Sequence, residues 1–390
     1  MGARAGLIRS GGTIRPDMTA VDPPAVPPSA PHGGFILCSC HPGAEAALAR
    51  RQADVLPEFA RGAWRRGLVT FRVGPAAFVP PDDFAPDLVF AHAIVRSLGQ
   101  VSGATLADLV RDARGLAGGA RWDAVHVWKR DPRIEVPLID VRRAVAAACG
   151  APSGDDATTR RGDRVLDCVI DAPDRWWIGW HVASSPSSTW PGGIYPGVMP
   201  ATAVSRAWLK LDEAVATFGL TFERGERALE LGAAPGGACQ RLLEAGLHVV
   251  GVDAAVVDAT VAAHPRFEQW RMRAREVPLR RFRGFDWLLT DMNIDPSSTM
   301  AALGRLLESA PDKPRGVIAT LKLPEWSRAA ELEGWLGRFR SWGYEPRARQ
   351  LSTGGRELCV CAVEHRRGVT PVGRDRRATR SPGRRGSRSG

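Results

Sequence analysis

The chain has 390 residues, of which 44% are hydrophobic, so it is long enough for two or three domains with packed cores. No apolar run approaches the roughly 20 residues that a membrane-spanning helix needs, and the N-terminus lacks the apolar stretch of a signal peptide. The net charge is +11, but the segment 366–390 contains nine Arg and one Asp and carries +8 of it. These properties predict a cytoplasmic protein without membrane spans, whose folded part is only weakly basic.

The seven cysteines are scattered along the chain. An odd, scattered set is not typical of a disulfide framework. Cys38 and Cys40, like Cys359 and Cys361, lack the CxxC spacing of most zinc sites. We therefore expect reduced, buried thiols and no metal site.

The N-terminal part begins with a segment, residues 1–33, that is rich in Pro, Gly, Ala and Ser and predicts a disordered leader. A small α+β domain is expected over 34–87. It contains strand-like segments at 35–38 and 68–73 and a helix at 44–59.

A second α+β domain is expected over 88–190. Its first segment, 88–100, is apolar, and helical and strand-like patterns alternate after it. Helices are predicted at 105–114 and 138–149, and strands at 124–128, 167–171 and 176–183. The Pro-, Ser- and Gly-rich stretch that follows predicts a linker over 191–203.

From residue 204 to 366, helices and strands alternate regularly. Several strands are apolar throughout, as buried parallel strands are. Helices are predicted at 206–218, 237–245, 298–309 and 328–341, strands at 228–232, 248–253, 285–291 and 316–323, and a terminal hairpin at 347–351 and 357–363. This pattern predicts a doubly wound α/β domain, followed by an Arg-rich disordered tail over 367–390.

A glycine-rich turn, from Gly232 to Gly237, joins the first strand of this domain to its helix. Glycines let the backbone approach a ligand closely, and Asp253, at the end of the next strand, can accept hydrogen bonds from two ribose hydroxyls. NAD and S-adenosylmethionine both fit this arrangement. The dinucleotide fingerprint requires GxGxxG, whereas Ala234 stands at the second glycine position and Pro235 follows it. The turn therefore favours S-adenosylmethionine, with a turn that binds no ligand as the alternative.

Four charged residues interrupt otherwise apolar elements of the same domain: Lys210 in a helix, Asp291 and Lys322 at the carboxyl ends of strands, and Glu357 at the start of the last strand. Ligands of open α/β sheets bind at the carboxyl ends of parallel strands, so we expect the four side chains to meet there. A lysine acts as a base only if its pKa falls toward about 7–8. We expect Lys210 to lower the pKa of Lys322, and the two carboxylates to orient the ammonium groups. The alternative is that each of the four is an ordinary surface charge or ion pair.

These four residues resemble the Lys-Asp-Lys-Glu tetrad of the FtsJ-like RNA ribose 2′-O-methyltransferases. The segments 205–211, 231–237, 290–292, 321–324 and 348–351 are also similar to that family, and most similar to its bacterial members that methylate a cytidine of 23S ribosomal RNA. The resemblance covers most of the chain but is specific only after residue 200. Before it, segments 37–43 and 176–180 are similar to the N-terminal and THUMP regions of those enzymes.

The resemblance implies a Rossmann-like S-adenosylmethionine methyltransferase sheet, preceded by smaller α+β domains with a THUMP-like RNA-binding region over 88–190. The substrate would be large-subunit ribosomal RNA, and Lys322 would accept the proton. The cofactor contacts would come from Ser205, Gly232, Ala234, Pro235, Gly236, Gly237, Asp253 and Asp291. One departure concerns adenine binding: Ala274 stands where the family has an acidic residue, and Glu276 is a candidate to replace it.

Two features outside the site suggest contacts with RNA. Tryptophans cluster near the end of the second domain and could stack on bases, although an alternating strand favours a core position; they are Trp176, Trp177, Trp180 and Trp190. Arginines at 271, 273, 275, 280, 281 and 283 could line an RNA path or form a solvated face. A non-catalytic RNA-binding protein and a dehydrogenase are the competing functions.

Overall fold

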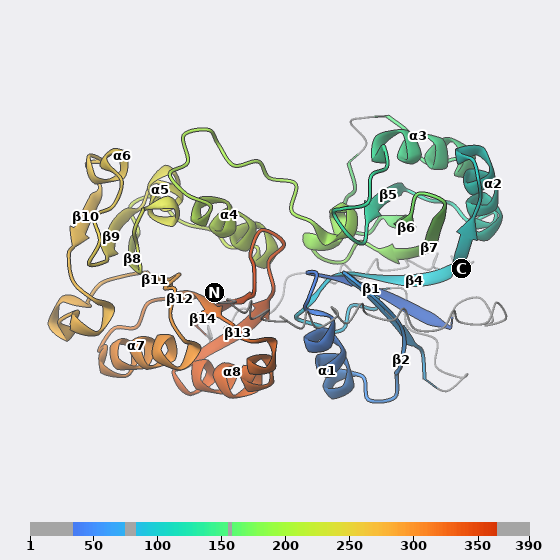
Figure 1. Ribbon diagram of the computed structural model, residues 1–390. Helices are drawn as coiled ribbons and strands as arrows, with labels where there is room; N and C mark the ends of the chain where they lie inside the picture. Colours follow the sequence, from blue (N-terminus) through green and yellow to red (C-terminus); the bar gives the residue numbers. More distant parts are fainter. Residues whose placement is uncertain (1–33, 75–82, 155–157, 365–390) are drawn as a thin grey trace, which may run out of the picture.

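The computed structural model describes residues 34–74, 83–154 and 158–364, which form two halves, each built around a seven-stranded sheet (Figure 1). The leader expected at 1–33 and the tail expected at 367–390 lie outside the described residues. Among the described residues, none of the helices is long and apolar enough to cross a membrane.

The N-terminal sheet is mainly antiparallel, with the strand order β2-β3-β1-β4-β7-β6-β5. Its strands are β1 (Phe35–Cys40), β2 (Ala60–Arg65), β3 (Leu68–Arg72), β4 (Ala91–Ser102), β5 (Ala124–Lys129), β6 (Arg164–Ala172) and β7 (Arg175–Val182), and its helices are α1 (Glu45–Val55), α2 (Leu106–Ala117) and α3 (Leu138–Cys149). Strand β2, with the sequence ARGAWR, has no alternating apolar pattern and was not among the predicted strands. Because β1 pairs with β4, the domain boundary expected at residue 87 falls between strands of one continuous sheet.

The tryptophans of this half belong mostly to its core. Trp176 is 1% exposed and packs among apolar side chains. Trp180 is 9% exposed, and the guanidinium groups of Arg96 and Arg164 lie 4.6 and 4.4 Å from its ring centre. These two residues therefore do not offer a free face for base stacking.

The segment between the two sheets begins as part of the N-terminal half. It contains two short 3-10 helices, Ser187–Thr189 and Pro191–Gly193. A Cβ added to Gly193 would lie 2.0 Å from the His92 carbonyl oxygen of β4, so this turn is packed directly on the sheet. Residues 194–206 then reach the C-terminal half without forming a helix or strand.

The C-terminal sheet has the order β10-β9-β8-β11-β12-β14-β13. Its strands are β8 (Arg227–Leu231), β9 (His248–Val252), β10 (Phe267–Trp270), β11 (Trp287–Thr290), β12 (Gly316–Lys322), β13 (Tyr344–Arg349) and β14 (Glu357–Glu364). The first five run parallel, and β14 and β13 complete the sheet as antiparallel strands. This confirms the predicted Rossmann-like α/β sheet, whereas the THUMP-like character of the N-terminal half stays a prediction.

Helices cover both faces of this sheet (Figure 1). They are α4 (Ala207–Phe218), α5 (Gly237–Glu244), α6 (Ala259–Ala262), α7 (Pro296–Ser309) and α8 (Leu332–Ser341). Apolar side chains of α4 and α5 form a core on one face, and those of α7 and α8 form a core on the other. The helix predicted at 328–341 is in fact a 3-10 turn, Trp326–Glu331, followed by α8.

The two halves are in direct contact. The backbone amide of Gln350 donates to the Val89 carbonyl at 2.9 Å, and Arg349 donates to the His92 carbonyl at 2.8 Å. One apolar cluster includes side chains of β1, α1, β11 and α7 and so extends across both halves. The carboxyl ends of the parallel strands are therefore held next to the N-terminal sheet.

Candidate active site

The four charged residues expected to meet do so at the carboxyl edge of the C-terminal sheet. Lys210 projects from α4, and Asp291 follows the last residue of β11. Lys322 ends β12, and Glu357 begins β14 directly opposite it in the antiparallel register. The antiparallel direction of β14 therefore brings a residue that starts a strand to the edge where parallel strands end.

The four side chains form a closed ring of alternating charge. The Lys322 ammonium lies 2.8 Å from Asp291 Oδ1 and also pairs with Glu357 Oε2. The Lys210 ammonium pairs with Asp291 Oδ2 and lies 3.2 Å from Glu357 Oε1. The four side chains are 11–21% exposed, so the ring is largely shielded from solvent. Two cations and two anions give it no net charge, and their pairing shows that they are not four separate surface charges.

The electrostatics of the ring differ from the expectation for Lys322. Burial lowers its pKa, but the charges and hydrogen bonds of Asp291 and Glu357 outweigh burial and raise the pKa above its ordinary value. For Asp291, burial raises the pKa, but the two lysines outweigh it and hold the pKa below its ordinary range. The predicted lowering of the Lys322 pKa by Lys210 is therefore wrong, because a carboxylate lies between the two ammonium groups.

A cavity of about 760 Å³ opens beside the ring, at the ends of β8, β9 and β11. It is lined by four residues that were predicted to bind the cofactor: Gly232, Ala234, Asp253 and Asp291. Small-molecule sites commonly have volumes of about 300–1,000 Å³. The cavity thus has the size and the position expected of a nucleoside-containing ligand site.

Asp253 is held at the wall of the cavity by the turn itself. One of its carboxylate oxygens accepts from the Ala234 amide at 3.1 Å, and the other accepts from the Ala255 amide at 2.9 Å. A carboxylate oxygen has two lone pairs, so each oxygen can accept a further hydrogen bond. This arrangement suits recognition of two neighbouring hydroxyl groups.

The other residues predicted for the cofactor site do not line the cavity; they are Ser205, Pro235, Gly236 and Gly237. Gly236 has a φ of +118° and precedes the first residue of α5. A Cβ on Gly237 would lie 2.2 Å from the Ser205 hydroxyl oxygen, which closely packs the start of α4 against α5. The close approach of Gly237 to Ser205 serves helix packing, and cofactor contact by these four residues stays a prediction.

The cavity is also lined by the residue at which the sequence departs from the family's adenine-binding pattern. Ala274 lines the cavity together with Met272, Arg273 and Arg275. The Glu276 carboxylate accepts from the Arg273 amide at 3.0 Å and is not among the lining residues. Glu276 therefore caps its own turn. It does not line the cavity, where an acidic residue that replaces the one missing at Ala274 would have to lie.

One residue near the ring was missed by the sequence interpretation. Glu230 lies within β8 and is 2% exposed, next to Cys239 of α5. An acid inside the apolar run Ala228–Leu231 was a signal that could have been used, since charged residues are almost never fully buried without a partner.

Comparison with known proteins gives the family. The FtsJ-like methyltransferase family model matches residues 203–309. A ribosomal RNA large subunit methyltransferase M of Halorhodospira halophila is 30% identical over 341 residues, which cover 82% of this chain and 91% of that protein. The chain belongs to this methyltransferase family. The dehydrogenase alternative is therefore wrong, and so is the alternative without enzymatic activity.

Other members are similar over a comparable length. The protein of the same name from Xanthomonas campestris is 29% identical over 353 residues, 84% of this chain and 99% of its own. Among solved structures, Aeropyrum pernix fibrillarin in complex with natively bound S-adenosyl-L-methionine is 17% identical, covering 50% of this chain and 81% of its own. Its TM-score of 0.34 is too low to bear on function.

Proposed function

We propose that this methyltransferase transfers a methyl group from S-adenosylmethionine to the 2′-hydroxyl of a cytidine in large-subunit ribosomal RNA. The observation that supports this most is the closed Lys-Asp-Lys-Glu ring beside the cavity. The names of the two relatives supply the substrate class, ribosomal RNA of the large subunit. The cytidine and the ribose hydroxyl come from the resemblance of the tetrad and its flanking segments.

The cavity fits S-adenosylmethionine by its volume and by the acceptor and apolar groups that line it. In this assignment Asp253 receives the ribose hydroxyls, the backbone between Gly232 and Ala234 faces the amino-acid part, and Met272 and Met292 supply apolar walls. S-adenosylmethionine supplies an electrophilic methyl group on a positively charged sulfonium. A Cβ at Gly232 would lie 2.7 Å from the Met292 side chain, which keeps this wall closely packed.

Lys322 is assigned as the base that takes the proton of the ribose hydroxyl. With S-adenosylmethionine bound, this oxygen would take up the methyl group, and sulfur would keep the electron pair of the carbon–sulfur bond. Asp291 and Glu357 hold the Lys322 Nζ at a fixed position, and Lys210 balances their charge. Asp291 lines the cavity, so a sulfonium cation bound there would oppose the field that raises the pKa of Lys322 and would favour the neutral amine.

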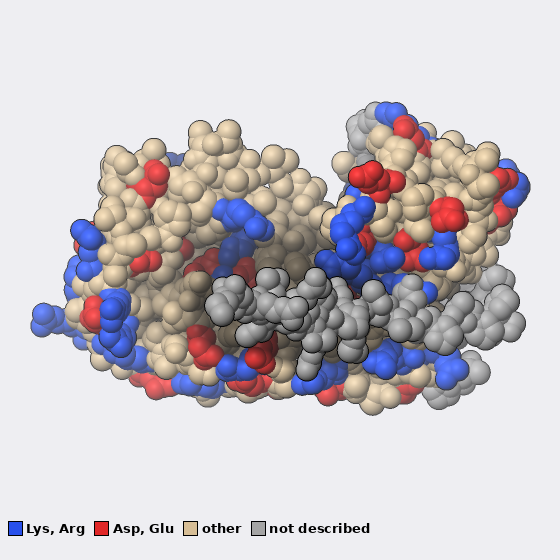
Figure 2. All heavy atoms as spheres, viewed as in Figure 1, with Lys and Arg blue, Asp and Glu red and all other residues tan. Residues whose placement is uncertain are grey.

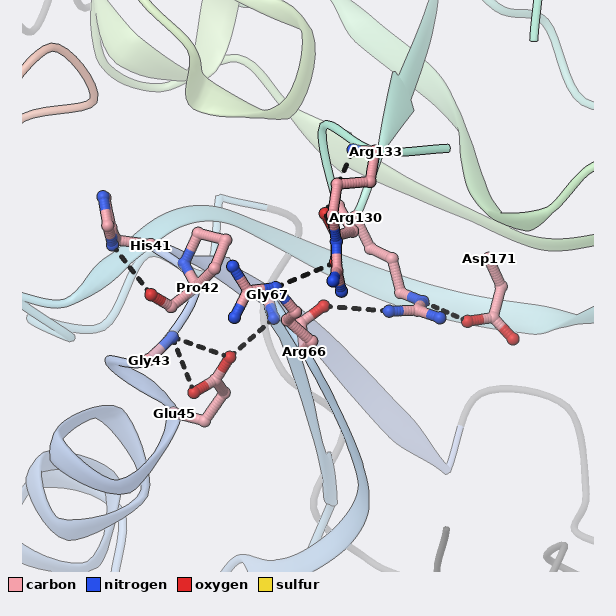
Figure 3. A network of polar contacts seen from close by, with 10 residues as sticks. His41, Pro42, Gly43, Glu45, Arg66, Gly67, Arg130, Arg133 and Asp171 are labelled. Atoms are coloured by element: carbon pink, nitrogen blue, oxygen red, sulfur yellow. Dashed lines mark hydrogen bonds and ion pairs between the residues drawn. The ribbon is translucent and has the colours of Figure 1, made fainter. Parts of the chain in front are cut away.

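A surface suited to an RNA backbone lies on the N-terminal half. Four arginines pair there with two aspartates whose side chains are 1–3% exposed. Figure 3 shows three of these arginines, Arg66, Arg130 and Arg133, together with Asp171. The arginines are Arg66, Arg130, Arg133 and Arg175. Side-chain hydrogen bonds from Arg133 lower the pKa of Asp131 to about 2, so this aspartate is charged at neutral pH. Two arginines for each aspartate leave an excess of positive charge.

The arginine array, as we call these four residues, is held in place but still accessible. Glu45 fixes the turn beside Arg66 by accepting from the Gly67 amide at 2.7 Å. The side chains of Arg66 and Arg133 are 51% and 74% exposed. Figure 2 shows further basic side chains on both sides of the hollow between the two halves. Oriented guanidinium groups of this kind bind phosphate well.

The proposed function is tested by mass mapping of ribose methylation in 23S ribosomal RNA, from cells with and without the gene. Purified protein is then given unmethylated RNA and S-adenosylmethionine. We expect one ribose methyl group that is lost without the gene and restored by the protein at a cytidine. Methylation of a base, or of no residue in the large-subunit RNA, would overturn the proposal.

A further inference from the structure

A third carboxyl group lies beneath the ring, and the proposed mechanism gives it no role. Glu230, on β8, points to the face of the sheet that α4 and α5 cover, where it is enclosed among apolar side chains and is 2% exposed. The Cys239 thiol of α5 donates to its Oε2 at 2.8 Å. A thiol is a weak donor, and no lysine or arginine forms an ion pair with Glu230 among the described residues.

Glu230 and the ring share one small cavity. This cavity, of about 30 Å³, is lined by Glu230 together with Lys210 and Asp291. The titratable groups around Glu230 come from every packed element: Lys210 of α4, Cys239 of α5, Asp291 after β11 and Cys359 of β14. Because little solvent lies between them, a change of charge on Glu230 changes the electrostatic potential at the charged groups of the ring.

The surroundings favour the neutral form of Glu230. Burial is the main cause and raises its pKa to about 8; the thiol of Cys239 and the charge of Lys210 oppose this, and the charge of Asp291 adds to it. The side chain is therefore a protonated acid at neutral pH and ionises within the range in which a methyltransferase is assayed.

Resting on the function proposed above, we propose that Glu230 is a positioning residue that sets when Lys322 can accept a proton. As a neutral acid it leaves two carboxylates for the two lysines of the ring. As a carboxylate it adds a third negative charge, which holds the lysine protons in place. Because the base must be an uncharged amine, ionisation of Glu230 opposes the reaction at the pH where that amine forms.

The test compares single-turnover methylation of the cognate RNA across pH 6–10 in wild type and Glu230→Gln. Glutamine keeps the shape of the neutral acid and cannot ionise, so we expect the midpoint of the rising pH profile to fall by about one pH unit. Glu226→Gln is the matched control, because Glu226 directly precedes the first residue of the same strand and pairs with Arg315. Its midpoint should stay unchanged.

Two further measurements separate this role from a structural one. Cys239→Ala removes the hydrogen bond that stabilises the carboxylate, so its midpoint should move in the same direction as that of Glu230→Gln. Infrared spectroscopy should show a protonated carboxyl band that disappears as the pH passes about 8 and that Glu230→Gln lacks. A lower rate at every pH with an unmoved midpoint, or the absence of the band, would overturn the proposal. A wild-type protein that methylates no RNA would instead contradict the proposed function. The infrared measurement would still test whether Glu230 is protonated.

Discussion

The two halves of the molecule use the same kinds of charged residue in different proportions. In the C-terminal half, two lysines and two carboxylates close a neutral ring at the sheet edge. In the N-terminal half, four arginines share two buried aspartates and leave an excess of positive charge on the surface. A neutral, shielded cluster of charges can hold a proton in a fixed place, whereas a cluster with excess positive charge can attract a polyanion such as RNA.

The largest effect should come from breaking the ring at its base. Lys322→Ala should lower single-turnover methyl transfer by about 10²–10⁴-fold, while S-adenosylmethionine binding, measured by calorimetry, stays nearly unchanged. Lys322→Arg should fail as well, because a guanidinium stays protonated at any workable pH. Since the pKa of Lys322 is raised above its ordinary value, the wild-type rate should increase as the pH rises.

A lysine outside the ring supplies the control for this comparison. Lys313 donates to the Trp342 carbonyl at 2.7 Å and touches neither the ring nor the cavity. Lys313→Ala should methylate RNA at close to the wild-type rate. An active Lys322→Arg protein would show that Lys322 only orients its neighbours.

The sequence predicted much of the C-terminal half because its signals are local. Apolar runs marked the parallel strands, and the four charged residues interrupted those patterns, so their convergence followed from the rule for strand ends. The state of Lys322 could not be predicted, because it depends on Asp291 lying between the two ammonium groups. In the N-terminal half, the array depends on loops that are far apart in the chain and on the polar strand β2, which carries no periodic signal.

A second change tests how closely the site depends on packing. A Cβ at Gly237 would lie 2.2 Å from the Ser205 hydroxyl oxygen and 2.9 Å from the Trp208 amide nitrogen. Gly237→Ala should therefore lower the free energy of unfolding by about 1–3 kcal/mol and displace the start of α4, which carries Lys210. Denaturant unfolding and single-turnover rates measure the two effects. Gly334→Ala, in α8 with open space around its Cβ, is the control and should not destabilise the protein.

The pH dependence of stability offers a third test, which concerns the buried acid. The pKa of Glu230 is about 8 in the folded protein, whereas the ordinary value is 4.5. Its neutral form stabilises the fold at low pH, and this contribution is lost as the pH rises from 4.5 toward about 8. Relative to Glu230→Gln, wild type should lose about 1.4 kcal/mol of unfolding free energy per pH unit in this window. Parallel unfolding curves at pH 5–8 that keep a constant separation would show that Glu230 is already ionised.

The smallest effect is expected in the N-terminal half, where each residue contributes one contact among several. The double variant Arg66→Ala/Arg133→Ala removes two exposed guanidinium groups and leaves Asp131 without these partners, so the excess positive charge of the array is lost. RNA affinity should fall by roughly tenfold, and the slope of its logarithm against the logarithm of salt concentration should flatten by about one to two units, since fewer counterions are released. Arg121→Ala is the control, because this side chain is 93% exposed and lies 3.7 Å from Asp123. Cofactor affinity should not change in either protein, because the cavity lies in the other half. If the double variant kept the wild-type salt slope, the array would be a structural cluster only, and RNA recognition would have to be sought on the C-terminal side of the hollow.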